Sequence, residues 1–203
     1  MRVVLATHNA HKVEEFQAIL GSVLPELEIV AYDGPEPVED GTSFAENALI
    51  KARTAALHTG LPALADDSGI CVDVMNGSPG IFSALWAGHG KGAQANLELL
   101  LDQMADIAPE NRGAHFACTI ALVVPATGAD QTGSEHVVEG IWPGALATEA
   151  HGGGGFGYDP IFVPEGHEVT AAELTAAEKN AISHRGRAFE AAIPLLRTTL
   201  IPD

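Results

Sequence analysis

Residues 114–124 read AHFACTIALVV and residues 135–141 read EHVVEGI, and these two stretches decide the fold class. The first is a long apolar run, and both contain the β-branched residues typical of strands. The residues between them are rich in Gly, Thr and Asp. Strand directly after strand predicts antiparallel neighbours in one sheet. A purely parallel sheet does not connect its strands in this way, so we expect a mixed sheet.

The segments on either side of these two strands complete an α/β pattern. Apolar residues at helical spacing alternate with short apolar runs, which predicts an α/β fold class with a mixed β-sheet flanked by helices. The expected strands are residues 2–7, 28–31, 64–65, 70–75 and 160–163, and the expected helices are residues 12–20, 44–59, 93–104 and a C-terminal helix around 189–196.

Composition limits the kind of protein and its partners. The chain has 203 residues, and we expect residues 1–203 to form a single domain. Its 27 acidic and 10 basic residues give a net charge of −17, which disfavours nucleic acid as a partner. No apolar run is long enough for a membrane span, and the start does not resemble a signal peptide. Cys71 and Cys118 lie in apolar stretches, as reduced buried thiols do, so we expect a cytoplasmic protein.

An acidic pair stands out at residues 65–69, which read ADDSG. Asp66 and Asp67 follow an apolar run, and we expect them at the carboxyl end of a strand, where α/β sheets usually bind ligands. Carboxylates are the ligands that Mg²⁺ prefers, and a carboxylate can also orient or deprotonate a water molecule. The alternative is an ordinary Asp/Ser/Gly turn.

Two further motifs combine scarce positive charge with polar groups. Residues 7–12 (THNAHK) precede and open a helix, where backbone N–H groups and Lys12 could bind an anion. Lys51 follows Asn47 by four residues, so the two share a helix face, downstream of the acidic loop at residues 33–41. Helix capping and solvated surface are the plain alternatives for both motifs.

Two late motifs have the chemistry of base recognition. Residues 156–160 (FGYDP) follow four glycines and offer an aromatic ring for stacking. Lys179 and residues 183–186 (SHRG) bring cationic donors to a helix start, where the helix macrodipole disfavours them unless they have a function. A flexible hairpin and a basic helix start are the alternatives. The remaining histidines lack zinc-ligand spacing.

Together these five motifs resemble the inosine triphosphate pyrophosphatase family, which hydrolyses noncanonical purine nucleoside triphosphates. The similarity runs from Thr7 to Arg185, and ADDSG, GGFGYDPIF and SHRG are near-verbatim. It implies an elongated structure of two lobes with a central active-site cleft, usually a homodimer. It also implies Mg²⁺-dependent hydrolysis of ITP, dITP and XTP to the monophosphate and pyrophosphate, which removes them from the nucleotide pool.

The resemblance assigns a role to each motif. Asp67 is the implied catalytic proton acceptor and an Mg²⁺ ligand, and Glu39 is the second metal ligand, with Asp40 as the alternative register. Asp66 is expected to shape the site. The triphosphate is expected to contact Thr7, His8, Asn9, Ala10, His11, Lys12 and Lys51, with Ser68 also touching the substrate. The implied base pocket comprises Phe156, Gly157, Tyr158, Asp159, Lys179, His184 and Arg185.

Two other functions remain open at this point. One is a pyrophosphatase for pyrimidine or standard nucleotides on a related scaffold, and the other is a non-catalytic nucleotide sensor. A sensor is expected to lose its metal carboxylates, whereas Glu39, Asp66 and Asp67 are all present. The sequence does not indicate the order of preference among ITP, dITP and XTP, or how GTP is rejected.

Overall fold

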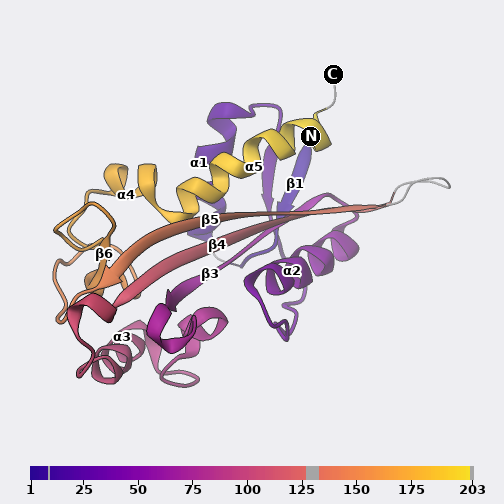
Figure 1. The fold of residues 1–203 in the computed structure, drawn as a ribbon. Helices are drawn as coiled ribbons and strands as arrows, with labels where there is room; N and C mark the ends of the chain where they lie inside the picture. The colour runs from indigo at the N-terminus through magenta and orange to yellow at the C-terminus, as the bar shows by residue number, and fades with distance from the viewer. Residues whose placement is uncertain (9, 127–132, 202–203) are drawn as a thin grey trace. The chain divides into compact units, whose positions relative to one another are not determined.

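The computed structural model describes residues 1–8, 10–126 and 133–201 of the chain, and of residues 10, 11 and 15 it describes the backbone alone (Figure 1). The predicted loop between the two long strands falls largely outside these residues. The strands are β1 (Arg2–Leu5), β2 (Glu28–Ala31), β3 (Ala63–Val72), β4 (Gly113–Val124), β5 (Ser134–Leu146) and β6 (Phe162–Pro164). The α-helices are α1 (Ala10–Val23), α2 (Phe44–Thr59), α3 (Gly92–Gln103), α4 (Ala176–Ile182) and α5 (His184–Leu200).

The strands form one open sheet of mixed direction. Their order is β2-β1-β3-β4-β5-β6, so β4 and β5 are neighbours as the opening motif predicts. Strand β1 pairs in parallel with β2 and β3, whereas β5 and β6 are antiparallel. The expected mixed sheet with flanking helices is therefore confirmed.

The chain divides into two compact units. Unit 1 comprises Met1–Asp67, Thr119–Glu139 and Ala188–Asp203, and unit 2 comprises Ser68–Cys118 and Gly140–Arg187. Strands β3, β4 and β5 and helix α5 each contribute residues to both units. The predictions of a single domain for residues 1–203 and of a central cleft stay predictions.

Unit 1 has a core of small side chains. Helix α2 packs against β1, and its buried alanines recur at helical spacing, which lets the helix approach the sheet closely. Ser43 caps the start of α2 by accepting the Glu46 N–H at 3.2 Å, and Gly60, with φ of 68°, ends it. The alanines are Ala48, Ala52, Ala55 and Ala56.

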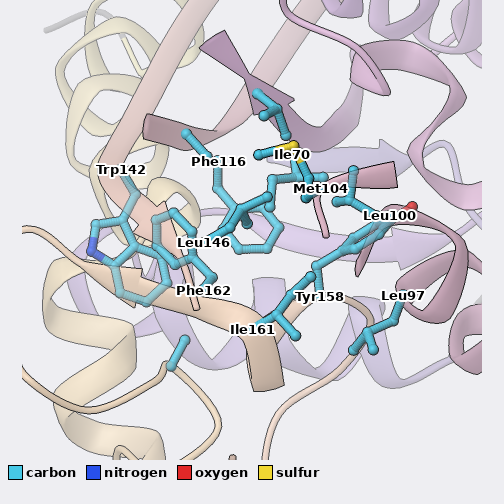
Figure 2. Packing of buried hydrophobic residues seen from close by; sticks show 13 residues of the cluster. Ile70, Leu97, Leu100, Met104, Phe116, Trp142, Leu146, Tyr158, Ile161 and Phe162 are labelled. Atoms are coloured by element: carbon cyan, nitrogen blue, oxygen red, sulfur yellow. The ribbon is translucent and has the colours of Figure 1, made fainter. Parts of the chain in front are cut away.

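Unit 2 has a core of larger, aromatic side chains. Figure 2 shows Phe116, Trp142 and Phe162 packed together with aliphatic residues from β3 and α3. The Phe116 and Phe162 rings meet edge to face, with centroids 4.8 Å apart, a favourable aromatic geometry. Leu97 and Leu100 of α3 and Met104 at its C-cap are buried in this core, as the predicted apolar stripe requires.

Three sequence predictions need correction. Asp66 and Asp67 lie in the middle of β3 and not at the end of a strand, because Ala63–Val72 is continuous and includes the segment expected to be a second strand. Residues 73–75 form a 3₁₀ turn. Pro160 also lies in a 3₁₀ turn, Asp159–Ile161, so the strand expected at 160–163 is β6, Phe162–Pro164.

Both cysteines are buried, as predicted. Within residues 1–8, 10–126 and 133–201, no helix has the length and apolar character that a membrane span requires.

Candidate active site

The first acidic residue of the ADDSG motif pairs with the first basic residue of the THNAHK motif. The Nζ of Lys12, near the start of α1, lies 2.9 Å and 3.0 Å from the two carboxylate oxygens of Asp66. The Asp66 side chain is 4% exposed, so its charge depends on nearby donors. Lys12 therefore neutralises a buried carboxylate in the middle of β3, and all of these atoms belong to unit 1.

The second acidic residue has a different set of partners. Lys51 of α2 places its Nζ 3.1 Å from an oxygen of Asp67 and 3.1 Å from an oxygen of Glu39. Burial raises the pKa of Asp67, and the charge of Glu39 adds to this, although Lys51 opposes it. Burial alone would lower the pKa of Lys51, but the two carboxylates outweigh it and the net shift is upward. Glu39, Lys51 and Asp67 thus form a charged cluster, which we call the Asp67 cluster.

Asn47 anchors the Asp67 cluster. Its side-chain oxygen accepts the backbone N–H of Gly41 at 2.9 Å, and its side chain also bonds to Asp67, which lowers the pKa of that carboxyl. The prediction that Asn47 and Lys51 share a helix face is confirmed, since both reach Asp67. A Cβ on Gly41 would lie only 2.6 Å from the Asn47 oxygen, so a glycine is needed for this close approach.

A cavity of about 210 Å³ lies beside these residues in unit 1. Five of the residues predicted to contact substrate or metal line it, namely Thr7, His8, Lys12, Glu39 and Lys51. The predictions that concern Asn9 and the side chains of Ala10 and His11 lie outside the described residues. Tyr32, Glu36 and Pro37 also line the cavity and were missed. Glu36 and Pro37 belong to the acidic loop at residues 33–41, and Tyr32 directly precedes it. The place of this loop, after the strand β2 that pairs with β1, was the available sign that these residues lie near residues 7–12.

The chemistry of the Asp67 cluster fits a divalent cation. Among the described residues, no group of three or more His, Cys, Asp or Glu side chains could by itself hold a metal ion. Mg²⁺ does not need such a group, because it usually takes one or two carboxylates and completes its shell with water and phosphate. Asp67 and Glu39 already share one cation, the Lys51 ammonium. Asp66 contacts a different ammonium, that of Lys12, so Asp67 and Glu39 are the two carboxylates that converge on one point.

In unit 2, a buried carboxylate holds the FGYD segment in place. Asp159 is 2% exposed, accepts the Phe156 N–H at 2.5 Å, and forms an ion pair with Lys179 of α4. The Tyr158 hydroxyl donates to the Ser83 carbonyl at 2.8 Å, and burial raises the pKa of that hydroxyl. Phe156 remains 82% exposed. The segment is thus fixed at two points and presents an aromatic ring to solvent.

The SHRG motif joins α4 to α5. The buried Ser183 hydroxyl accepts the Gly186 N–H at 3.2 Å, which caps α5. His184 stacks on Phe116, with centroids 4.8 Å apart and planes 12° apart. Arg187, also basic, donates to the carbonyls of Ile182 and Ile141 and so has a structural role.

The predicted site residues therefore form two groups. Thr7, His8, Lys12, Glu39, Lys51 and Asp67 belong to unit 1, whereas Ser68, Phe156, Gly157, Tyr158, Asp159, Lys179, His184 and Arg185 belong to unit 2. Ser68, half-buried in β3, follows Asp67 directly in the chain. Together the open mixed sheet and its flanking helices define an α/β protein with a polar cavity in unit 1 and an exposed aromatic ring in unit 2.

Comparison with known proteins gives the family. The model of the Ham1 family matches residues 3–195. A protein of Leifsonia xyli named dITP/XTP pyrophosphatase is 63% identical over 202 residues, covering 100% of this chain and 98% of the relative. A relative of the same name from Streptomyces coelicolor is 56% identical, covering 98% of each chain. The solved structure of a HAM1 protein from Coxiella burnetii is 40% identical, covers 98% of this chain and all of that one, and has a TM-score of 0.88.

The chain belongs to the Ham1 family. This confirms the resemblance that the five motifs carry, and the similarity in structure extends over nearly the whole chain.

Proposed function

We propose that this protein is a hydrolase acting on acid anhydrides that cleaves dITP and XTP, and also ITP, to the nucleoside monophosphate and pyrophosphate. Relatives at 63% and 56% identity bear the name dITP/XTP pyrophosphatase. The observation that carries the proposal is the Asp67 cluster, in which one ammonium lies 3.1 Å from each of two carboxylates beside a polar cavity. The cell would use this activity to remove noncanonical purines from its nucleotide pool.

Mg²⁺ is the proposed cofactor, with Asp67 and Glu39 as its ligands. When bound there, it supplies charge neutralisation for the phosphate groups. Glu39 is favoured over Asp40 because its carboxylate already reaches the Lys51 ammonium that Asp67 contacts. Asp66 is held by Lys12 and shapes the site.

In the proposed reaction, Asp67 accepts a proton from a water molecule that attacks the α-phosphorus. Lys12 and Lys51 supply positive charge for the triphosphate, and Thr7 supplies a hydroxyl at the end of β1. His8, Asn9, Ala10 and His11 belong to the same phosphate-side segment, and Ser68 touches substrate from its position next to Asp67. The Lys12 and Lys51 ammonium groups contact phosphate oxygens of the bound triphosphate, and Lys12 stays paired with the buried Asp66.

Base recognition is assigned to unit 2. The exposed Phe156 ring provides the stacking surface, held by Gly157, Tyr158 and Asp159. The donors for a 6-oxo group come from Lys179, His184 or Arg185. Adenine has a 6-amino group at that position and would leave such donors unpaired, a penalty of roughly 10⁴-fold or more in the most selective enzymes.

A substrate panel tests this proposal. Purified protein is incubated with ITP, dITP, XTP, GTP, ATP or dTTP at one Mg²⁺ concentration, and pyrophosphate and orthophosphate are measured separately. We expect pyrophosphate from the first three substrates and its loss on addition of EDTA. A preference for dTTP, or release of orthophosphate alone, would contradict the proposed function.

Three wider expectations accompany the function. Residues 1–203 act as a single catalytic domain, the protein is a homodimer, and it works in the cytoplasm without a nucleic-acid or membrane partner. The net charge of −17 and the burial of both cysteines support the last point. Light scattering on the purified protein checks the homodimer, since a monomer mass would exclude it.

A further inference from the structure

His8 has partners on both sides of its ring. Its Nε2 lies 3.0 Å from the Gly34 carbonyl oxygen, and its Nδ1 lies 2.9 Å from a carboxylate oxygen of Glu36. Both partners can only accept hydrogen bonds, whereas a neutral imidazole has a single N–H. The two contacts together join residue 8 to residues 34 and 36 through both nitrogens of one ring.

The His8 ring also contacts Tyr32, the residue that directly precedes the acidic loop. His8 stacks on Tyr32, with centroids 5.7 Å apart and planes 13° apart. The Tyr32 hydroxyl donates to the Pro35 carbonyl at 2.9 Å, and its ring is buried. Gly34 fits tightly in this arrangement, since a Cβ there would lie 2.4 Å from the Tyr32 hydroxyl oxygen. Contacts among residues 32–36 thus hold this segment together, and the contacts of His8 link it to the residues that follow β1.

The contacts of His8 with the acidic loop matter because this loop carries Glu39, the second proposed metal ligand. No helix or strand occurs between the end of β2 at Ala31 and the start of α2 at Phe44, so side-chain contacts must define the path of the loop. Glu39 lies three residues beyond Glu36 and reaches Lys51. His8, Glu36, Pro37 and Glu39 all line the 210 Å³ cavity in unit 1.

We propose that His8 is a positioning residue that holds the acidic loop against the phosphate-side segment and so places Glu39 for the metal. It acts through Glu36 and Gly34 and not as a direct ligand of phosphate. This deepens the proposed function and rests on it, because it concerns the same cavity. The proposed reaction assigns no proton transfer or metal contact to residue 8, so its effect is on affinity more than on turnover.

The competing role for His8, direct binding of the terminal phosphate, makes the opposite prediction for Glu36. If Glu36 only competes with phosphate for the His8 ring, then Glu36→Gln frees His8 and strengthens substrate binding. If His8 and Glu36 hold the loop together, then removing either partner releases it. In that case Glu36→Gln weakens binding to the same extent as His8→Ala, and the double variant loses nothing more.

The test uses full-length protein and two readouts. The affinity for Mn²⁺ alone, measured by electron paramagnetic resonance, reports on the placement of Glu39 without turnover. Steady-state kinetics with XTP separate KM from kcat. For His8→Ala we expect about threefold to fivefold weaker Mn²⁺ binding and a similar rise in KM, as loss of a part-exposed ion pair implies. The kcat at saturating Mg²⁺ stays within about twofold.

Matched variants decide the outcome. His89→Ala removes an exposed histidine of unit 2 and should leave both readouts unchanged. His8→Gln keeps one donor and should give an intermediate effect. The inference is overturned if His8→Ala binds Mn²⁺ like the wild type, if Glu36→Gln binds substrate more tightly, or if the two effects add. Inactive wild-type protein would instead refute the proposed function, and Mn²⁺ binding would still test His8.

Discussion

The two groups of site residues use buried charge in different ways. In unit 1, Lys12 and Lys51 contact carboxylates that line or adjoin a cavity, and Asp67 and Glu39 share one ammonium. In unit 2, the buried Asp159 and its partner Lys179 fix a segment whose aromatic ring, Phe156, faces solvent. Under the proposed function, the first arrangement offers ammonium groups to a phosphate chain, whereas the second presents a flat apolar surface to a base. The comparison leads us to propose that phosphate chemistry and base selection are separable in this chain.

The largest effect should come from the Asp67 cluster. Asp67→Asn keeps the size of the side chain but removes the proton acceptor and one metal oxygen. We expect kcat for XTP to fall roughly 10³-fold, the scale of a lost general base, while thermal stability changes little. Asp106→Asn, which removes an exposed carboxylate of unit 2, is the control and should keep wild-type kcat. Near-normal turnover by Asp67→Asn would remove Asp67 from the chemistry.

The pair of Lys12 and Asp66 should matter for stability as well. Lys12→Met takes the ammonium away from a carboxylate that is 4% exposed, and we expect a loss of about 3 kcal/mol in the free energy of unfolding. The double variant Lys12→Met/Asp66→Asn removes both charges and should recover most of this loss. Urea unfolding measures both, and a double variant as unstable as the single one would contradict the pairing.

A smaller effect is expected in unit 2. Phe156→Ala removes a ring that is 82% exposed, so stability should change by less than about 0.5 kcal/mol. Loss of a base-stacking surface should raise KM for XTP about tenfold with little change in kcat. Leu57→Ala, at a position 89% exposed in unit 1, is the matched control. An unchanged KM in Phe156→Ala would show that the ring does not stack on the base.

The smallest expected effect is a shift in the acid limb of the pH profile of kcat/KM. Burial raises the pKa of Asp67 above the model-compound value of 3.8, and only its ionised form accepts a proton. As pH falls through the raised pKa, kcat/KM should fall, so the acid limb lies above that of an ordinary aspartate. Asn47 lowers this pKa, so Asn47→Ala should move the limb to still higher pH. A limb that moves to lower pH would contradict the assignment.

Local patterns in the sequence predicted most of the sheet. The strand at 114–124 and its place beside the strand that follows it in the chain were predicted from the sequence. The continuity of β3 did not, because Asp, Ser and Gly are poor strand formers in isolation. The strand is possible since Lys12 and Lys51 bond to Asp66 and Asp67, and these partners are remote in the chain. Helix α4, with seven residues, was too short for a periodic signal and depends on its Thr175 capping box.

Residue types predicted the members of the site but not their partners. The motif at residues 7–12 indicated an anion site, yet nothing in it specified that Lys12 would contact Asp66, 54 residues away. Tyr32 and Glu36 were missed because an aromatic residue and an acid in a Pro-rich loop have no distinctive spacing. Their role is visible only through His8, which contacts both.

The most direct test of the division between phosphate chemistry and base selection is the ratio of kcat/KM for XTP to kcat/KM for ATP. We expect Lys12→Met to lower both values by a similar factor and leave the ratio near that of the wild type. Lys179 is one of the proposed donors to the 6-oxo group, and we expect Lys179→Met to lower the ratio about tenfold or more. A ratio that collapses in Lys12→Met, or persists in Lys179→Met, would contradict the division.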